Sequence, residues 1–427
     1  MEVKIVNIND VIKFKDTDVK VNSVSPFNFE NLQMRDVLID NNVYKLNKTF
    51  LIGQTIKSCS PRFLFYICGD NILIGREARF YISIMYKQAT DELIIDNQFR
   101  KTVPSIVSAL QNFKNLRDKN IEKYQHYINN TDNINYTTFL STKQIAHHIH
   151  NELPGIYHIV NSDIKITHAF AYTEMVARNK ELFPSINFLD RVTNEECFLK
   201  VCNENLTFIK HTLPNIQPEL LTRIKSFSAA NSTYNKTNKC FLLTIRFKKR
   251  AITNQFEFIK STILLLERKF PESTYLIDGC VNWYISTPTD WGTTDEQLFV
   301  NTLKNEIPQC NIHSLIGQDV PQYIKNLENV DFYIAHCHTP QQKVGYLSHA
   351  GGIIHGTYSD KPTIPRPNIN EIEAHRNTSN KIGVGCTVVH YPANCFTYTS
   401  ESWEHPAPLQ YTANIEECIK FLDSYLG

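Results

Sequence analysis

The sequence has no long apolar run. No stretch approaches the roughly 18 consecutive apolar residues that a membrane-spanning helix requires. The first residues, MEVKIVNINDVIKFKD, also lack the apolar centre of a signal peptide. We therefore expect a cytoplasmic protein. Peripheral attachment at the inner face of the membrane is the one membrane contact that these absences leave open.

An excess of charge of one sign is missing as well. The 427 residues carry 44 basic and 43 acidic side chains, which gives a net charge of +1. A nucleic-acid-binding protein usually shows a basic excess, so we expect no nucleic-acid partner. The 11 cysteines are scattered without CxxC pairs, a spacing unsuited to structural zinc and typical of reduced, buried thiols.

Glycine-rich phosphate-binding loops are absent too. The chain has neither a GxGxxG nor a Walker motif, so an ordinary dinucleotide or ATP site is not supported. What is present is a globular composition, 42% hydrophobic and 11% aromatic. The length predicts two or three domains.

The pattern of apolar residues divides the chain into three predicted domains. Residues 1–135 are expected to be β-rich with one helix, residues 136–232 to form an α/β domain, and residues 233–427 to form a second one. The polar stretch at residues 228–239 has no large aliphatic side chain and marks the last boundary.

Apolar periodicity predicts the elements of each domain. The first domain is predicted to hold strands at residues 3–6, 49–52, 62–68, 71–74, 80–85 and 93–95 and a helix over residues 104–127. The second is predicted to hold helices over residues 142–153, 194–210 and 217–227 and a strand within residues 163–170. The third alternates strands at residues 241–247, 274–277, 312–316, 332–335 and 353–354 with helices over residues 254–269, 296–307, 320–327, 341–350 and 413–425. Such alternation predicts βαβ units and a parallel sheet.

Polar residues gather at predicted strand ends within DFYIAHCHTPQQKVGYLSHAGGIIHG, residues 331–356. In an open α/β sheet, ligands bind beyond the carboxyl ends of the strands. Side-chain donors and a helix start at that edge can hold a pyrophosphate, so we predict an anion site. A metal pair, for which no carboxylate lies nearby, and purely structural histidines are the alternatives. The residues concerned are His336, His338, Gln342, Lys343 and His355.

Two further segments are candidates for contact with a phosphate or a ribose. Arg246 and Lys248 follow the first strand of the third domain, where a basic residue can meet a phosphate; the alternative is a solvated charge run. Glu373 lies in a Pro- and Asn-rich segment, where its carboxylate can accept ribose hydroxyls, unless the segment is simply an exposed polar loop.

A histidine and a carboxylate occur four residues apart in the second domain. On the helix predicted there, with Ser141 as N-cap and Pro154 as its end, His148 and Glu152 share a face. The two side chains can therefore act at one point as general acid and base. A surface helix with titrating histidines is the alternative.

Together these segments resemble a known family. The block from Phe241 to the end is similar to the carboxyl-terminal half of a GT-B glycosyltransferase, an enzyme of two Rossmann-like domains. HHIHNELPGIYHIV, residues 147–160, resembles a segment of bacterial capsular-polysaccharide and plant-xylosyltransferase-like enzymes, where it lies in the amino-terminal half and faces the cleft. This chain departs from the group at residues 336–339, where His-Cys-His-Thr replaces His-Gly-Ala-Gly.

The resemblance implies an α/β fold of two Rossmann-like domains with an additional β-rich amino-terminal region. That region is expected to serve acceptor binding or homo-oligomerisation. The implied activity is metal-independent transfer of a hexosyl or pentosyl group from a nucleotide-sugar to a glycan or other hydroxyl acceptor, in surface polysaccharide or glycoconjugate synthesis. The nucleotide-sugar is a co-substrate, and no tightly bound cofactor is expected.

The resemblance also implies roles for the candidate residues. Arg246 or Lys248, with Lys343, would hold the donor diphosphate. His355 and Glu373 would contact the base or ribose. Glu152 or His148 would take the acceptor proton. Two rival interpretations stay open: a non-catalytic binding or scaffold protein on a degenerate glycosyltransferase fold, and a sugar-phosphate epimerase or phosphorylase on the same scaffold.

Overall fold

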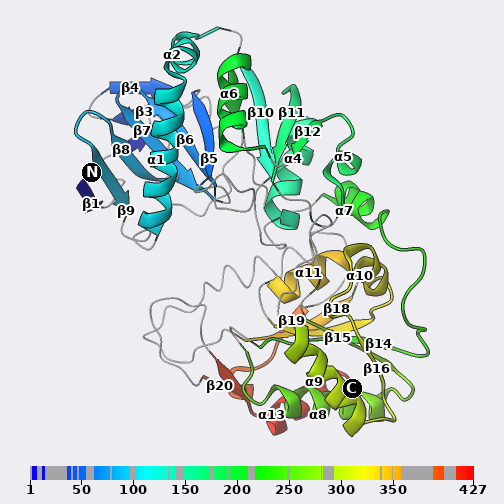
Figure 1. The fold of residues 1–427 in the computed structure, drawn as a ribbon. Coiled ribbons are helices and arrows are strands. Elements are labelled where there is room, and N and C mark those ends of the chain that lie inside the picture. The colour runs from blue at the N-terminus through cyan, green and yellow to red at the C-terminus, as the bar shows by residue number, and fades with distance from the viewer. Residues whose placement is uncertain are drawn as a thin grey trace. The chain divides into compact units, whose positions relative to one another are not determined.

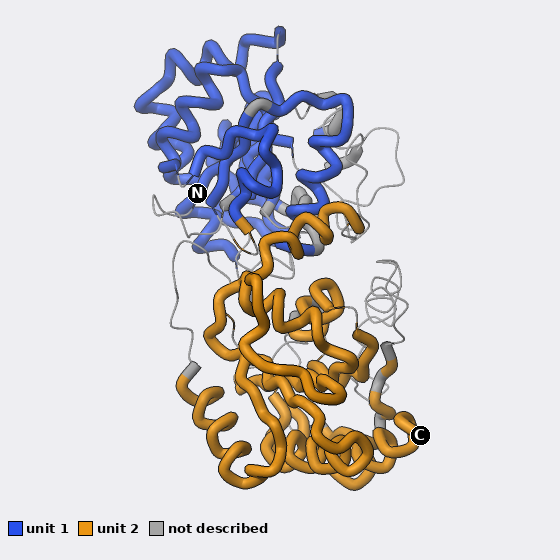
Figure 2. Tube along the Cα trace, turned by 90° about the vertical axis from the view of Figure 1, so that its right-hand side faces the viewer, with its two compact units in different colours: residues 1–174, 178–216 blue, residues 175–177, 217–427 orange. Residues whose placement is uncertain are grey.

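The structure of the chain is a computed structural model. The chain forms two units, which Figure 2 colours separately. Unit 1 comprises residues 1–174 and 178–216, and unit 2 comprises residues 175–177 and 217–427. The described residues are 2–6, 12–14, 36–39, 42–45, 48–53, 62–76, 79–96, 102–132, 134–140, 148–172, 175, 177–190, 192–209, 217–247, 251–279, 281, 293–336, 339–348, 350–356, 388–398 and 410–427.

Unit 1 begins with a six-stranded sheet in the order β1-β9-β8-β7-β6-β5 (Figure 1). All six predicted strands are present. β1 pairs with β9 in parallel, and the other neighbours are antiparallel. Gly69, with φ +60°, begins the two-residue link between β6 and β7, where a hairpin turn requires a positive φ. The strands are β1 (Glu2–Val6), β5 (Thr49–Gly53), β6 (Arg62–Cys68), β7 (Asn71–Arg76), β8 (Arg79–Lys87) and β9 (Glu92–Asp96). A small antiparallel sheet joins β2 (Ile12–Phe14), β3 (Asp36–Ile39) and β4 (Asn42–Lys45).

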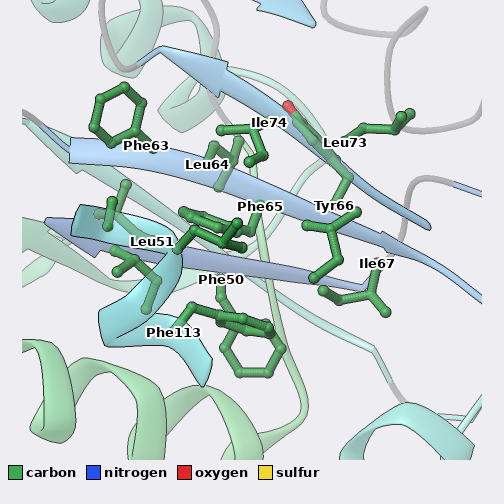
Figure 3. Close-up of a cluster of buried hydrophobic side chains, with 14 of the residues drawn as sticks. Phe50, Leu51, Phe63, Leu64, Phe65, Tyr66, Ile67, Leu73, Ile74 and Phe113 are labelled. Carbon is green, nitrogen blue, oxygen red and sulfur yellow. The ribbon is translucent and has the colours of Figure 1, made fainter. Parts of the chain in front are cut away.

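Two helices follow where one was predicted. α1 (Val103–Lys119) and α2 (Ile121–Asn129) are separated at Asn120, whose φ and ψ of −126° and 40° are not helical. α1 buries Phe113 against Phe65 of β6, with ring centroids 5.3 Å apart, and Phe113 also meets Phe50 of β5 (Figure 3). These aromatic contacts hold α1 against the sheet.

Unit 1 also contains a four-stranded parallel sheet in the order β12-β11-β10-β13. Counted along the chain, this order is 3-2-1-4. Its strands are β10 (Asn135–Leu140), β11 (Ile166–Ala171), β12 (Asn187–Asp190) and β13 (Leu206–Phe208). α5 (Asn179–Leu182) lies between β11 and β12. The same hydrophobic core contains Phe50 of the first sheet and Phe208 of the second.

The helix predicted over residues 194–210 is shorter than expected. α6 (Asn194–Glu204) starts with a capping box between Thr193 and Glu196 and ends at Asn205, whose φ is +50°. The left-handed conformation stops the helix, and the chain turns directly into β13. The prediction of helix beyond Asn205 was therefore wrong.

Unit 2 is built on a six-stranded, wholly parallel sheet in the order β16-β15-β14-β17-β18-β19. Counted along the chain, this order is 3-2-1-4-5-6, that of a doubly wound, Rossmann-type sheet. Helices α10 and α11 cover one face, and α8, α9 and α13 cover the other (Figure 1). The expected α/β class with parallel sheets is thus confirmed.

The bounds of these elements lie close to the predicted ones. The strands are β14 (Cys240–Thr244), β15 (Thr274–Asp278), β16 (Asn311–Ser314), β17 (Phe332–His336) and β18 (Gly351–His355). The helices are α7 (Pro218–Lys225), α8 (Gln255–Lys269), α9 (Thr293–Glu306), α10 (Val320–Leu327), α11 (Thr339–Leu347) and α13 (Ile415–Tyr425). Not predicted were β19 (Val388–His390) and the antiparallel pair β20 (Phe396–Tyr398) and β21 (Tyr411–Ala413).

Two expectations from composition can be compared with the described residues. Seven cysteines among them are buried and form no disulfide: Cys68, Cys197, Cys202, Cys240, Cys310, Cys395 and Cys418. Within the same part of the chain, no helix is both long enough and apolar enough to cross a bilayer.

Candidate functional site

The order of strands in unit 2 reverses between β14 and β17, and two buried polar side chains mark that point. Thr244 ends β14 and His336 ends β17. Thr244 Oγ1 accepts a hydrogen bond of 2.8 Å from the His336 backbone N–H and lies 3.0 Å from His336 Nδ1. In doubly wound sheets this reversal opens the crevice in which ligands bind.

A second buried histidine lies beside the first. His355 ends β18, directly opposite His336 in the strand register, and the two ring centroids are 4.3 Å apart. His355 Nδ1 is 3.0 Å from the hydroxyl of Tyr411, which β21 supplies. Both rings are almost wholly buried, and neither Nε2 has a hydrogen-bond partner among the described residues.

The hydroxyl partners determine what each Nε2 offers. When a hydroxyl donates to Nδ1, the hydrogen of the neutral ring is on Nε2, which is then a donor; when the hydroxyl accepts, Nε2 is an acceptor. Thr244 Oγ1 already accepts from a backbone N–H, and its own hydrogen is free to go to His336 Nδ1. In either arrangement each Nε2 is a buried polar atom suited to a ligand.

Both rings are neutral at physiological pH. Burial holds the pKa of His336 well below its usual value, and electrostatic repulsion from His355, were it protonated, and from the charged Arg246 lowers it further. Burial alone lowers the pKa of His355 to about 3. The positive charge of Arg246 beside two neutral imidazoles favours an anion over a metal cation at this point.

Arg246 itself is tied to the start of α8. Its backbone N–H donates a 2.8 Å hydrogen bond to Oε1 of Gln255, and its side chain is partly exposed. The link fixes the backbone where it leaves β14. The charge of Arg246 lowers the pKa of His336. That Arg246 meets a phosphate stays a prediction.

Lys343 occupies a different environment from the one expected of a diphosphate ligand. Its Nζ donates to Oδ1 of Asp278 at 2.7 Å and to the carbonyl oxygen of Gly279 at 2.9 Å. The hydroxyl of Tyr323 donates to Oδ2 of Asp278 at 3.2 Å. Burial raises the pKa of Asp278, and the charge of Lys343 offsets part of that rise. This buried ion pair at the end of β15 engages two of the three N–H donors of Lys343.

The remaining donor-binding candidates cannot be compared with the structure. Lys248, His338 and Glu373 lie outside the described residues, and so does the side chain of Gln342. Their roles stay predictions.

His148 and Glu152 form a buried pair in unit 1. His148 Nδ1 lies 3.1 Å from Oε2 of Glu152, and both side chains are fully buried. His148 Nε2 has no hydrogen-bond partner among the described residues. The structure therefore brings together the two residues that were predicted to act at one point, and it buries them, contrary to a surface helix.

The local backbone around this pair differs from the prediction. His148–Glu152 form a single π-helical turn, η4, and α4 (Leu153–Val160) continues from it with Pro154 in its first turn. The prediction that Pro154 ends the helix was wrong, since proline is tolerated in a first turn. Pro154 has no N–H for the carbonyl four residues earlier and crowds that carbonyl, which favours the wider turn before it.

Some residues of the site were not predicted to belong to it. Thr244 and Tyr411 hold the two histidine rings, and Asp278 neutralises Lys343. For Thr244 and Asp278 a signal existed, because each is the last, polar residue of an apolar strand. For Tyr411 the sequence contains no such signal, because this residue lies 56 positions after His355. The pairing of β21 with β20 and with Ile252 brings Tyr411 to His355.

The site can also be tested as a metal centre. No group of three or more His, Cys, Asp or Glu side chains that could hold a metal ion occurs in the part of the chain that the structure describes. His336 and His355 supply two imidazoles, which is fewer than the ligands of a structural or catalytic zinc site. Independence from metal stays a prediction.

Comparison with known proteins adds little. No protein-family model matches the chain, and no curated protein matches it significantly. Among solved structures, the crystal structure of TarM matches with a TM-score of 0.21 and 11% sequence identity, over 82% of this chain and 64% of TarM. The chain spans less than two thirds of the length of TarM, and a likeness this low supports no conclusion about function.

Proposed function

We propose that this protein is a GT-B-type glycosyltransferase that moves a hexosyl or pentosyl group from a nucleotide-sugar to a glycan or other hydroxyl acceptor. One observation carries the proposal: the switch point of a Rossmann-type sheet holds two buried imidazoles whose Nε2 atoms have no partner among the described residues. Such atoms are costly to bury unless a ligand satisfies them. The parallel sheet of unit 1 supplies the second Rossmann-like domain of the proposal.

Unit 2 provides the donor site. Arg246 brings positive charge to the nucleoside diphosphate, the leaving group, and His336 and His355 donate to it or to the ribose. Fixed donors and charges of this kind stabilise a departing diphosphate without a metal. Lys248, His338, Gln342 and Glu373 complete the proposed site from the sequence prediction. Lys343 supports it through Asp278 at the end of β15.

The same geometry argues against an ordinary dinucleotide site. In dinucleotide-binding domains an acidic residue after the second strand accepts the ribose hydroxyls. Here Asp278 holds that position, but it is fully buried and paired with Lys343 and Tyr323. A nicotinamide dinucleotide would also need the glycine-rich turn that the sequence lacks.

Unit 1 provides the acceptor side. The buried pair of His148 and Glu152 supplies the general base that a hydroxyl nucleophile requires. The β-rich sheet that precedes it serves acceptor binding or association with a second copy. Synthesis of surface polysaccharide or glycoconjugate, in the cytoplasm and at the inner face of the membrane, is the setting that we propose.

Thermal-shift measurements with a panel of nucleotides and nucleotide-sugars, without metal, test the donor site. A ligand at 100 times its dissociation constant should add about 2.7 kcal/mol of stability. Arg246→Ala should lose most of the shift, whereas Arg268→Ala, which removes an exposed arginine of the same unit, should keep it. No shift with any nucleotide would overturn the donor site, and a shift without sugar transfer would favour a binding protein.

A further inference from the structure

The first strand of unit 1 leaves one edge of its sheet open to a partner. β1 is the last strand of the six-stranded sheet on its side and pairs, among the described residues, with β9 alone (Figure 1). We propose that β1 pairs antiparallel with β1 of a second copy of this chain, with Val3 opposite Val3 of that copy. The inference gives the β-rich sheet one partner and does not depend on the proposed glycosyl transfer.

The backbone of β1 shows which groups face the open edge. The N–H of Glu2 donates a 3.1 Å hydrogen bond to the carbonyl oxygen of Asp91, so the backbone groups of Glu2 point towards β9. This direction alternates along a strand, so Lys4 also points towards β9, whereas the N–H and C=O groups of Val3 and Ile5 point away from it. Such a row of groups on an edge strand is a template for another strand.

The side chains of Val3 and Ile5 continue the core of the sheet to its edge. Each lies opposite a fully buried residue of β9, yet Val3 is 41% exposed and Ile5 is 43% exposed. The row that contains Ile5 crosses all six strands, and Phe113 of α1 packs on its Phe65. A further strand at the edge would cover the exposed end of this apolar face. In register order the row is Ile5, Ile95, Ile84, Ile74, Phe65 and Phe50.

The charges of β1 favour a second copy as the partner and select the register. With Val3 opposite Val3, Glu2 of each copy lies opposite Lys4 of the other, and opposite charges across a strand pair are stabilising. A shift that places Lys4 opposite Lys4 would set like charges against each other. Lysine on an edge strand often opposes pairing, but the ammonium of Lys4 is held by Glu92 at 2.6 Å, on the face away from Val3.

The proposed interface is symmetric and small. Both copies contribute the same strand, as in an interface with two-fold symmetry. β1 has five residues, so the strands overlap over a short length and the dimer should be weak and reversible. Sedimentation velocity over a series of protein concentrations, with any purification tag at the carboxyl end, should show a monomer–dimer equilibrium.

Charge reversal tests the register. Glu2→Lys and Lys4→Glu should each weaken the dimer by roughly tenfold or more, because each converts two attractive pairs into repulsive ones. An equal mixture of the two variants should recover the dimer, since the strand of one is then basic at both positions and the strand of the other acidic. Glu122→Lys and Lys123→Glu, the same reversals at exposed positions of α2, should dimerise like the wild type.

Proline substitution tests the backbone. Val3→Pro removes an N–H that points to the open edge and keeps the hydrogen bonds to β9, a position at which an edge strand tolerates proline. It should abolish the dimer and leave the midpoint of urea unfolding unchanged. Lys4→Pro removes an N–H directed at β9 and should lower that midpoint.

The same measurements can overturn the proposal. A wild-type protein that is monomeric at every concentration would do so, and so would a dimer that survives Val3→Pro. A mixture of Glu2→Lys and Lys4→Glu that stays monomeric would exclude the register with Val3 opposite Val3. Nucleotide binding and sugar transfer enter none of these measurements, so their absence would overturn the proposed function and leave the dimer untouched.

Discussion

Thr244 and His336 are joined twice, once through the backbone N–H of His336 and once through its Nδ1. One hydroxyl on β14 therefore fixes both the end of β17 and the ring that stands on it. We expect Thr244→Val, which keeps the shape and removes the hydroxyl, to cost about 1–3 kcal/mol, because it leaves a buried N–H unsatisfied. It should also weaken nucleotide binding, as measured by the thermal shift.

Thr262→Val is the matched control for that change. Thr262 is equally buried, on α8, but its hydroxyl has no hydrogen-bond partner among the described residues. The control should be close to neutral in urea unfolding. Equal costs for the two variants would show that the hydroxyl of Thr244 does not hold the histidine.

The histidine pair makes stability depend on pH. In the folded protein the pKa of His336 lies well below its usual value, and the pKa of His355 is lowered to about 3. The pKa of a histidine in the unfolded chain is about 6.5. Below pH 6.5 the unfolded chain binds protons that the folded chain does not, so stability falls as the pH falls from about 6.5 towards 3. Each ring contributes up to about 1.4 kcal/mol per pH unit in that window.

Urea unfolding at a series of pH values measures this effect. His355→Phe should flatten the decline between pH 6.5 and pH 4, since it removes one of the two titrations. His126→Gln, at an exposed position of α2, should retain the full slope. A slope unchanged in His355→Phe would mean that the ring is not kept neutral by burial.

Lys343 and Asp278 are expected to depend on each other. Lys343→Met leaves the fully buried carboxylate of Asp278 without its counter-charge and should cost about 3–5 kcal/mol in chemical denaturation. Adding Asp278→Asn should recover a large part of this loss. Lys260→Met, which breaks the exposed pair with Glu306, should cost less than about 1 kcal/mol.

The Lys343 variants also test the donor site. If Lys343 serves through Asp278, the double variant should retain nucleotide affinity once folded. If it holds the diphosphate directly, as the resemblance implies, affinity should fall in the double variant as well as in Lys343→Met. The thermal shift of the double variant distinguishes the two roles.

Gly356 is expected to resist substitution for two reasons. Its φ is +87°, and an added Cβ would lie 2.5 Å from the hydroxyl of Tyr411, the partner of His355. Gly317 shares the first feature, with φ +75°, but an added Cβ there would meet no atom within 4 Å among the described residues. Gly317→Ala should therefore cost about 1–2 kcal/mol from backbone strain alone.

Gly356→Ala should cost more than Gly317→Ala by about 1–3 kcal/mol, the usual effect of overpacking. It should also weaken nucleotide binding, because Tyr411 must move away from His355. If the two variants lose equal free energies of unfolding, the Tyr411 hydroxyl can move aside from the added Cβ without an energetic cost.

Elements that repeat a local pattern of apolar residues could be predicted without the structure. The strands and helices from β14 to β18 could be predicted because each strand is a short apolar run and each helix has an apolar stripe. The same holds for the strands β5 to β9. α6 was predicted too long, because only pairing with β10 makes a strand of the three residues of β13. Asn120 broke a predicted helix whose spacing was otherwise regular.

The candidate site divides in the same way. Strand ends with polar residues could be found from the sequence, and His336, His355, His148 and Glu152 were predicted as candidates on that basis or by their spacing. Tertiary structure alone decided that β14 lies between β15 and β17, since hydrogen bonds between strands far apart in the chain leave no local pattern. It also decided that Tyr411 holds His355 and that Lys343 is bound by Asp278. Those contacts depend on distances between side chains that only the folded backbone sets.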